Sequence, residues 1–458
     1  MLAVLAATVA ASGCACGLAA EAAEAAGRTS VAIRGTKFLV DGRVTYPGRP
    51  VEGMLLNSRM VQAVFDDENP ATRGLWRYPD TGRWHPDRNT REFVAALPLY
   101  AAHGLRAVTI GLQGGLPRPG AALQRWHVSA FRADGSLKPA WLARLDRAIR
   151  ACDTHGIAVI LSLFYFGQDS RLENEAAVLR GTDAVTDWLL ARGYRNVLVE
   201  INNETSTRGY TFPILRPARV HELIARVRRR SRGRLDVGTS FAPGVAGGTA
   251  PTDAVIRSSD YVLVHGNGLD PSGLRSLVRR VRSRPAYRAA PKPIVVNEDS
   301  TALPSLDAAV AAGASWGYYD QGLPNYRDGF QSLPVNWRIN TLEKRAFFDR
   351  VLELAGGPIP AGSRAESSGR RSPTSRSSRA TACSDTGSAA ISSAMRSAAR
   401  RYCGSARHGR QPPGLLPAWP SPRRALARHP APRSGPRSAA GRRPWAAGRA
   451  AGRGPARP

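Results

Sequence analysis

The sequence predicts an α/β protein in which eight parallel strands close into a (β/α)8 barrel. From residue 51 to about residue 355, short apolar runs that suit strands buried on both faces alternate with segments of helical period. The apolar runs number eight, which fits a closed ring. An open doubly wound sheet is the alternative, but no G-x-G-x-x-G motif follows the first run.

A β-hairpin is expected ahead of the barrel, in residues 27–50. The stretch "SVAIRGTKFLVDGRVTYPG" alternates apolar and polar residues and contains the turn dipeptide Asp41-Gly42. We expect this hairpin to cover the bottom of the barrel.

The barrel itself is predicted over residues 51–357. Its strand candidates are 51–56, 105–112, 157–166, 196–201, 234–241, 261–266, 292–298 and 313–320. The first helix is expected to open with a capping box formed by Asn89 and Glu92. Two later segments, 137–156 and 219–233, repeat the same apolar stripe.

The N-terminus predicts export. Residues 1–26 combine an apolar stretch with small residues, which indicates a signal peptide or a lipoprotein signal. The letters "ASGC", which end at Cys14, resemble a lipoprotein cleavage box, although Ala11 stands where Leu is usual. We therefore expect a secreted, periplasmic or cell-surface protein, with membrane contact only through a lipid anchor at Cys14, which stays open.

The net charge of +30 is unevenly distributed. Residues 361–458 contain 20 Arg, no Lys and two acids, and so carry +18 of it. Residues 358–458 are accordingly predicted to be a disordered tail rich in Arg, Ser, Pro and Ala. Nucleic-acid binding by the tail is the alternative, but we expect no specific nucleic-acid partner, and a monomer.

No cofactor or metal is expected. Cys152 sits on the apolar face of a predicted helix, which is typical of a buried inert thiol, and no Cys/His spacing indicates zinc. The acidic stretch "FDDEN" (65–69) lacks the spacing of a calcium loop, so a loop-capping role is favoured over a cation site.

Carboxylates follow two of the strand candidates. The fourth ends in Asn203-Glu204 and the seventh in Asn297-Glu298-Asp299, and in a closed barrel both ends lie at the active-site mouth. Two carboxyl groups about 5–5.5 Å apart are what retaining glycoside hydrolysis requires. Asp299 is the rival to Glu298 if the register is off by one residue.

The other strand ends bring further side chains to the same mouth. They are Asn57, Arg59, Gln113, Tyr165, Gln168, Asp169, His265, Asn267, Trp316, Tyr318 and Tyr319. Glu200 shares a strand face with Glu204 and is expected to point into the barrel with a structural hydrogen bond. Aromatic residues on the predicted loops could stack on sugars or pack a loop core: Trp76, Tyr78, Trp84, Trp126, Tyr326 and Trp337.

These segments resemble clan A (β/α)8 glycoside hydrolases, in particular the cellulase-like family 5, over residues 35–355. "NVLVEINNET" is similar to the strand-four motif, "KPIVVNEDS" to the strand-seven motif, "YVLVHGNG" to the strand-six His segment and "GASWGYYD" to the Trp strand. The resemblance implies that Glu204 is the acid/base and Glu298 the nucleophile. It also implies that Asn203 binds the sugar 2-hydroxyl, that His265 lines the cleaving subsite and that Trp316 stacks under the sugar ring.

The sequence departs from this pattern at several positions. Gln113 stands where Arg is usual, so Arg59 is expected to substitute, Tyr165 replaces a His, Asn267 replaces a Tyr, and Asp299 replaces an aromatic residue. The sugar, the linkage and endo or exo action therefore stay open.

We expect a retaining glycoside hydrolase that cleaves a poly- or oligosaccharide by double displacement. Its mechanism asks for a raised pKa at Glu204 and an ionised Glu298. The alternative is a catalytically inactive carbohydrate-binding or cell-envelope protein on the same barrel.

Overall fold

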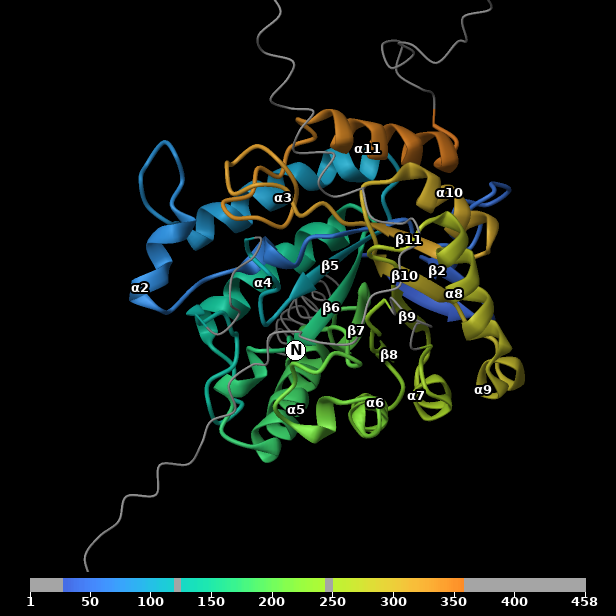
Figure 1. Ribbon diagram of the computed structural model, residues 1–458, viewed down its shortest axis with the longest axis horizontal. Coiled ribbons are helices and arrows are strands. Elements are labelled where there is room, and N and C mark those ends of the chain that lie inside the picture. Colours follow the sequence, from blue (N-terminus) through green and yellow to red (C-terminus); the bar gives the residue numbers. More distant parts are fainter. Residues whose placement is uncertain (1–27, 119–124, 244–249, 358–458) are drawn as a thin grey trace, which may run out of the picture. The chain divides into compact units, whose positions relative to one another are not determined.

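Eight parallel strands form a nearly closed barrel in the computed structural model, which describes residues 28–118, 125–243 and 250–357 (Figure 1). Hydrogen-bonded neighbours follow the order β8-β7-β6-β5-β4-β11-β10-β9. The predicted (β/α)8 architecture is confirmed. The strands are β4 (Asn57–Arg59), β5 (Ala107–Gly111), β6 (Ala158–Phe164), β7 (Val197–Asn202), β8 (Asp236–Gly238), β9 (Val262–His265), β10 (Ile294–Glu298) and β11 (Ser315–Tyr318).

The first barrel strand begins later than the sequence predicted. Residues 51–56 were expected to form it, but the strand starts at Asn57 because Gly53 adopts a left-handed backbone (φ +78°) that interrupts the extended chain. Leu55 and Leu56 are nevertheless fully buried at its base.

Between β8 and β9 the ring is joined by two backbone bonds, each of which connects a residue of one strand to a residue just outside the other. Asp260 N donates to Val237 O at 2.9 Å, and His265 N donates to Phe241 O at 3.1 Å. These two bonds join the edges of the sheet at both ends of the seam.

Helices surround the ring, and an apolar layer lies between them and the strands (Figure 1). None of the helices in the described ranges is long and apolar enough to cross a membrane. The helices are α2 (Pro70–Arg73), α3 (Pro86–Ala102), α4 (Pro139–Thr154), α5 (Glu175–Arg192), α6 (Val220–Ser231), α7 (Asp253–Ser258), α8 (Pro271–Ser283), α9 (Pro285–Ala289), α10 (Leu303–Ala311) and α11 (Leu342–Ala355).

The expected capping box at the start of α3 is wrong. The helix begins at Pro86, so Asn89 lies inside it and is fully buried. Asn89 Nδ2 donates to Gln62 O at 2.7 Å, and Asn89 Oδ1 accepts from Trp337 Nε1 at 3.1 Å. Its side chain therefore ties two loops to the helix instead of capping it.

A small antiparallel sheet covers the barrel bottom, as predicted. It contains β1 (Val31–Arg34), β2 (Lys37–Val40) and β3 (Arg43–Val44), one strand more than the expected hairpin. Asp41 and Gly42 form the turn between β2 and β3 with positive φ angles of 51° and 73°. Phe38 is fully buried against residues of the barrel interior that include Ala107, Ile160 and Leu198.

Several predictions concern residues outside the described ranges. The signal over 1–26, a lipid anchor at Cys14 and the tail over 358–458 all lie there.

Candidate active site

Glu204 and Glu298 meet at the carboxyl ends of the strands. Glu298 is the last residue of β10, and Glu204 follows β7 by two residues. One carboxylate oxygen of each and one ring nitrogen of His265 all lie within 4.8 Å of one another. The barrel thus brings together two acids that are 94 positions apart in the sequence.

The backbone of Glu204 is held in an unusual conformation. Its φ of +50° lies in the left-handed region that non-glycine residues rarely adopt. Its N–H donates to Ser240 Oγ at 2.8 Å, and Thr205 N donates to Ser240 O at 2.9 Å. The end of β8 therefore fixes the turn that aims the Glu204 carboxyl at the mouth.

His265 joins the two acids. The imidazole is fully buried at the end of β9, and its Nδ1 lies 3.0 Å from Glu204 Oε1 and 3.4 Å from Glu298 Oε2. Burial lowers the pKa of His265, but the charges of Glu298 and Glu204 and the hydrogen bond to Glu204 outweigh burial and raise it. The geometry therefore favours a protonated imidazole between the carboxylates.

The pKa of Glu204 departs from the prediction. Burial raises the pKa of this carboxyl, but the hydrogen bond and charge of His265 and the charge of Arg59 outweigh burial and lower it. These two directions favour a proton on the His265 imidazole over a proton on Glu204 itself. Sequence reasoning missed this because it did not place a cation next to Glu204.

Arg59 holds the second acid from the last position of β4. Its Nε lies 2.6 Å from Glu298 Oε2, and its Nη2 donates to Asn203 Oδ1 at 2.8 Å. Burial lowers the pKa of this guanidinium, but the charges of Glu298 and Glu200 outweigh burial and raise it. Arg59 thus occupies the position beside Glu298 that the sequence assigned to it.

Asn267 orients the other oxygen of Glu298. Its Nδ2 donates to Glu298 Oε1 at 3.0 Å, and the residue is half-buried just beyond β9. Arg59 at the end of β4 contacts Oε2 and Asn267 just beyond β9 contacts Oε1, so both oxygens of Glu298 are held.

Two tyrosines line the acids. Tyr165 follows β6 and Tyr319 follows β11. Burial, and next the charge of Glu298, raise the pKa of both hydroxyls. The sequence predicted both tyrosines at the mouth, although it assigned the substrate contacts of the eighth strand to Trp316 and Tyr318.

The structure contradicts substrate contact by Trp316 and Tyr318. Both are fully buried on the outer face of β11, where Tyr318 stacks on Phe347 of α11 at a centroid distance of 4.4 Å. Trp316 Nε1 donates to Asp299 Oδ2 at 2.6 Å, behind the strands. Alternate residues of a strand point to opposite faces, and in β11 the inward-facing set is shifted by one residue from the expected one. Tyr319 therefore faces the mouth in place of Trp316.

Gln113 is also no substrate contact. Its exposed fraction is 2%, its Nε2 donates to Ser129 Oγ and Gln168 O, and its Oε1 accepts from Tyr165 N at 3.0 Å. The side chain ties the β5–α4 loop to the end of β6 and thereby positions Tyr165.

Asp299 and Glu200 stand apart from the pair. Asp299 accepts a hydrogen bond from Trp316, and burial raises its pKa to about 6, so it is not the rival nucleophile.

Glu200 is fully buried in the barrel, but its expected structural hydrogen bond is absent: neither oxygen has such a partner within the described residues. Arg59 Nη1 also lacks one there, and the Glu200 charge raises the pKa of Arg59.

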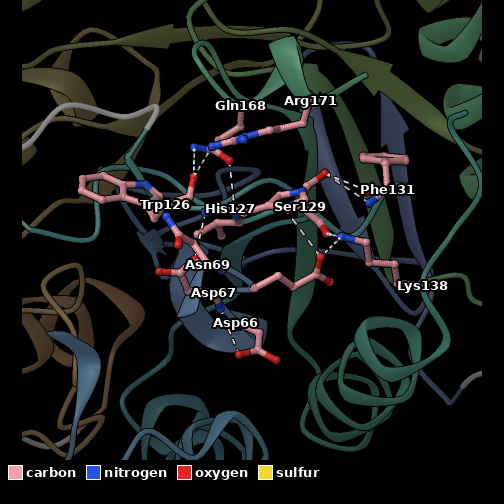
Figure 2. Close-up of polar contacts among 12 residues, drawn as sticks. Asp66, Asp67, Asn69, Trp126, His127, Ser129, Phe131, Lys138, Gln168 and Arg171 are labelled. Carbon is pink, nitrogen blue, oxygen red and sulfur yellow. Dashed lines mark hydrogen bonds and ion pairs between the residues drawn. The ribbon is translucent and has the colours of Figure 1, made fainter. Parts of the chain in front are cut away.

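The acidic stretch 65–69 caps a loop, as predicted. Asp67 Oδ1 accepts from Asn69 N and His127 N, and its Oδ2 accepts from Thr72 Oγ1 and Trp76 Nε1. Figure 2 shows Asp66, Asp67 and Asn69 beside the segment from Trp126 to Phe131, with Gln168 and Arg171 on its other side. Both carboxylate oxygens of Asp67 therefore accept hydrogen bonds that hold the loop together.

The aromatic residues of the loops pack against one another and do not form an exposed platform for sugars. Trp76, Tyr78, Trp84, Trp126 and Trp337 are each at most 7% exposed. Their rings contact one another or Phe65, Phe93 and Phe330. They stiffen the loops over the mouth, and only Tyr326 is half-buried.

Glu204, His265 and Glu298 form the one group of potential metal ligands found among the described residues. Arg59 Nε already contacts Glu298 Oε2 at 2.6 Å, and the positive charge of the guanidinium stands where a metal ion would bind that oxygen. Moreover, the imidazole nitrogen nearest the acids serves as their hydrogen-bond donor. The arrangement therefore suits proton transfer better than metal binding.

Comparisons with known proteins bear on the fold. No family model and no curated protein matches the sequence. The barrel is similar to a family 5 glycoside hydrolase from Bacteroides vulgatus, with 11% identity, a TM-score of 0.44, and coverage of 71% of this chain and 70% of that one. It is similar to a β-mannanase from the blue mussel Mytilus edulis, with 12% identity, a TM-score of 0.43, and coverage of 70% and 96%.

A third similar structure is a broad-specificity endoglucanase from an uncultured bacterium, with 12% identity, a TM-score of 0.41, and coverage of 69% of this chain and 96% of that one. All three are glycoside hydrolases. At such identities the chemistry of the present site has to be derived from its own residues.

Proposed function

We propose that this protein is a retaining glycoside hydrolase that cleaves O-glycosidic bonds of a poly- or oligosaccharide. The observation that carries the proposal is the approach of Glu204 and Glu298 to within 4.8 Å between carboxylate oxygens. Double displacement uses carboxyl groups about 5–5.5 Å apart, whereas inversion needs about 6.5–9.5 Å to admit a water molecule. The short separation therefore supports retention.

In the first step, Glu298 acts as the nucleophile. Its carboxylate oxygen bonds to the anomeric carbon while the bond from that carbon to the leaving oxygen breaks. Arg59 and Asn267 hold the carboxylate in place, so little reorientation is needed before attack. The leaving oxygen takes a proton from Glu204.

The proton for this step is stored on the pair of Glu204 and His265. In the free protein it resides on the imidazole, 3.0 Å from Glu204 Oε1. Negative charge developing on the leaving oxygen draws the proton through Glu204, and His265 ends the step neutral. Asn203 presents Oδ1 to Arg59, which leaves its amide nitrogen for a sugar hydroxyl.

In the second step, water attacks the anomeric carbon. Glu204 accepts a proton from that water, the new bond to oxygen forms, and Glu298 leaves as a carboxylate. The sugar regains its original configuration, and the proton returns to the pair of Glu204 and His265.

A second candidate is a carbohydrate-binding or cell-envelope protein without turnover. The low pKa of Glu204 in the free protein favours it, because a permanently ionised Glu204 could not protonate a leaving group. In either case we propose an exported protein, because residues 1–26 have the composition of a signal. We also propose that it acts as a monomer.

The test is turnover of aryl glycosides and polysaccharides by the full-length protein. We expect Glu298→Gln and Glu204→Gln to lower kcat on polysaccharide by about 10³-fold or more. The matched control is Glu173→Gln, which changes an exposed glutamate after β6 and should leave kcat unchanged. Wild-type activity in Glu298→Gln would refute the proposal, and glycan binding without wild-type turnover would favour the second candidate.

A further inference from the structure

A hollow of about 310 Å³ lies on the same face as the acids. Three loops that follow β4, β5 and β11 form it, and loops at the carboxyl ends of barrel strands surround the active-site mouth. Its lining includes Leu75, Arg77, Pro79, Arg118, Pro324 and Pro334.

Two guanidinium groups at this hollow lack a counter-ion among the residues that the structure describes. Neither Arg77 nor Arg118 forms an ion pair with any residue in the described ranges, and Arg77 Nη1 donates a long hydrogen bond to Gly74 O at 3.4 Å. The acid closest in sequence, Asp80, binds Arg88 through both oxygens at 2.9 and 2.8 Å. The positive charge at the hollow is therefore available to a ligand.

The rim of the hollow is apolar and exposed. Leu75, in the lining, is 39% exposed, and Leu323, which precedes the lining residue Pro324, is 57% exposed. They are two of the four large hydrophobic residues exposed in the described part of the chain. Proline rings at 79, 324 and 334 adjoin them with fixed backbone angles. A sugar that carries a negative group suits this lining, because its apolar ring faces can contact the proline rings and its charge can contact the unpaired arginines.

Hydrogen bonds tie the loop after β11, which begins at Tyr319, to the loop after β5 at this hollow. Tyr319, which lies beside Glu298, donates its hydroxyl proton to Gln321 Oε1 at 2.5 Å. Gln321 Nε2 donates to Leu116 O at 3.3 Å, and Leu333 N donates to Pro117 O at 3.0 Å, next to Arg118. The loop after β11 therefore runs from Tyr319, whose pKa is raised by burial and next by the charge of Glu298, to the lining of the hollow at Pro324 and Pro334.

The base of the hollow is rigid. Tyr78, between Arg77 and Pro79, is fully buried, stacks on Trp84 at 5.6 Å, and carries the Arg88 guanidinium 3.9 Å from its ring centre. The backbone that presents Arg77 is thus fixed before a ligand arrives, which lowers the entropy cost of binding.

We propose that this hollow is a subsite for an acidic sugar, so that the substrate is an anionic polysaccharide. Arg77 and Arg118 contact a carboxylate or sulfate on a sugar residue some units away from the bond at Glu204 and Glu298. The inference rests on the proposed function for the place of the cleaved bond, but the binding itself does not require turnover.

The experiment compares two double variants of the full-length protein in the Glu298→Gln background, which prevents hydrolysis. The test variant is Arg77→Gln with Arg118→Gln. The control is Arg83→Gln with Arg91→Gln, which removes the same charge from exposed arginines outside the hollow. Binding is measured by interferometry on immobilised polygalacturonate, alginate and glucuronoxylan (carboxylate), carrageenan (sulfate), and the neutral polymers cellulose and mannan.

We expect the test variant to bind at least one anionic polymer about five- to thirtyfold more weakly, with neutral polymers and the control unaffected. Loss on the carboxylated polymers or on carrageenan identifies the anionic group. The control is essential because a net charge of +30 attracts any polyanion.

Three results would overturn the inference: equal losses in both double variants, no loss in either, or an equal loss on neutral polymers. Turnover of a neutral aryl glycoside is measured separately with Glu298 intact, where the test variant should stay within about twofold of wild type. If the wild type has no turnover, the proposed function fails while the binding comparison still decides this inference.

Discussion

At the scale of single residues, the chemistry depends on how one proton is shared. Glu204 lies in a left-handed conformation fixed by Ser240, which costs on the order of 1 kcal/mol and is typical of functional positions. That conformation places its carboxyl against a fully buried imidazole. The pair of Glu204 and His265 therefore titrates as a unit, and its proton is held more firmly than a lone carboxyl would hold it.

His265→Gln should move the alkaline limb of the pH profile of kcat/KM to lower pH by at least about one unit. In the wild type the raised pKa of His265 keeps the proton on the pair above the ordinary imidazole value, whereas in the variant the Glu204 carboxyl must hold it alone. We also expect kcat/KM at the optimum to fall about 10- to 100-fold.

The measurement is the full pH profile on an aryl glycoside with a good leaving group. His155→Gln, which changes the residue that ends α4, is the control and should leave the limb in place. An alkaline limb that stays put or moves upward in His265→Gln would contradict the shared proton.

At the scale of elements, the sequence located most strands because each is an apolar run bounded by glycine or polar residues. The places of Glu204, Glu298 and Arg59 at the barrel mouth were predicted from the ends of those runs. What the sequence could not provide is the parity of β11, because both faces of a barrel strand are buried and "SWGYY" carries aromatic residues on each.

Packing decides that parity. Leu55 N donates to Ser315 Oγ, and Gly317 lies against Asn57, so the small residues of β11 face the crowded barrel interior. The rings of Trp316 and Tyr318 then fill the wider layer against α11. Small residues at alternate positions were the available signal that Tyr319 reaches the mouth.

Gly317→Ala should destabilise the barrel by about 1–3 kcal/mol and reduce activity. A Cβ at this position would lie 2.3 Å from Asn57 Oδ1 and 2.8 Å from the backbone carbon of Asn297, the residue before Glu298. Urea unfolding followed by circular dichroism measures the loss. The control is Gly74→Ala, because φ is −66° there and an added Cβ would have no atom within 4 Å. We expect it to change the free energy of unfolding by less than about 0.5 kcal/mol. Equal urea midpoints for the two variants would contradict the assigned packing.

At the scale of the whole molecule, the site exists because the ring closes. The backbone bonds between β8 and β9 join the segment that supports Glu204 to the strand that carries His265. Asp236 and Asp260 lie at the bottom of this seam, where Val237 N donates to Asp260 Oδ2 at 2.9 Å. No sequence pattern places these two acids together, because their proximity depends on closure.

Asp236 should make the barrel less stable as pH rises from about 4 to about 6. Burial, and next the charge of Asp260, raise its pKa from 3.8 to about 6, so in this window the folded state binds more protons than the unfolded state. Asp236→Asn should therefore flatten the fall and stabilise the protein at pH 7 by up to about 2 kcal/mol.

Thermal unfolding of both proteins between pH 4 and pH 8 measures the effect, with Asp349→Asn in α11 as the control. Parallel curves for the wild type and Asp236→Asn across the window would show that Asp236 does not have a raised pKa in the folded protein.

The central claim is that Glu298 forms a bond to the anomeric carbon of a sugar. The most direct measurement is to incubate the protein with an activated 2-deoxy-2-fluoro glycoside, which slows the second step more than the first, and to locate the label by peptide mass spectrometry. The account predicts one glycosyl ester on Glu298, and none in Glu298→Gln. A label on Asp299 or another side chain, or a product of inverted configuration with no label, would contradict it.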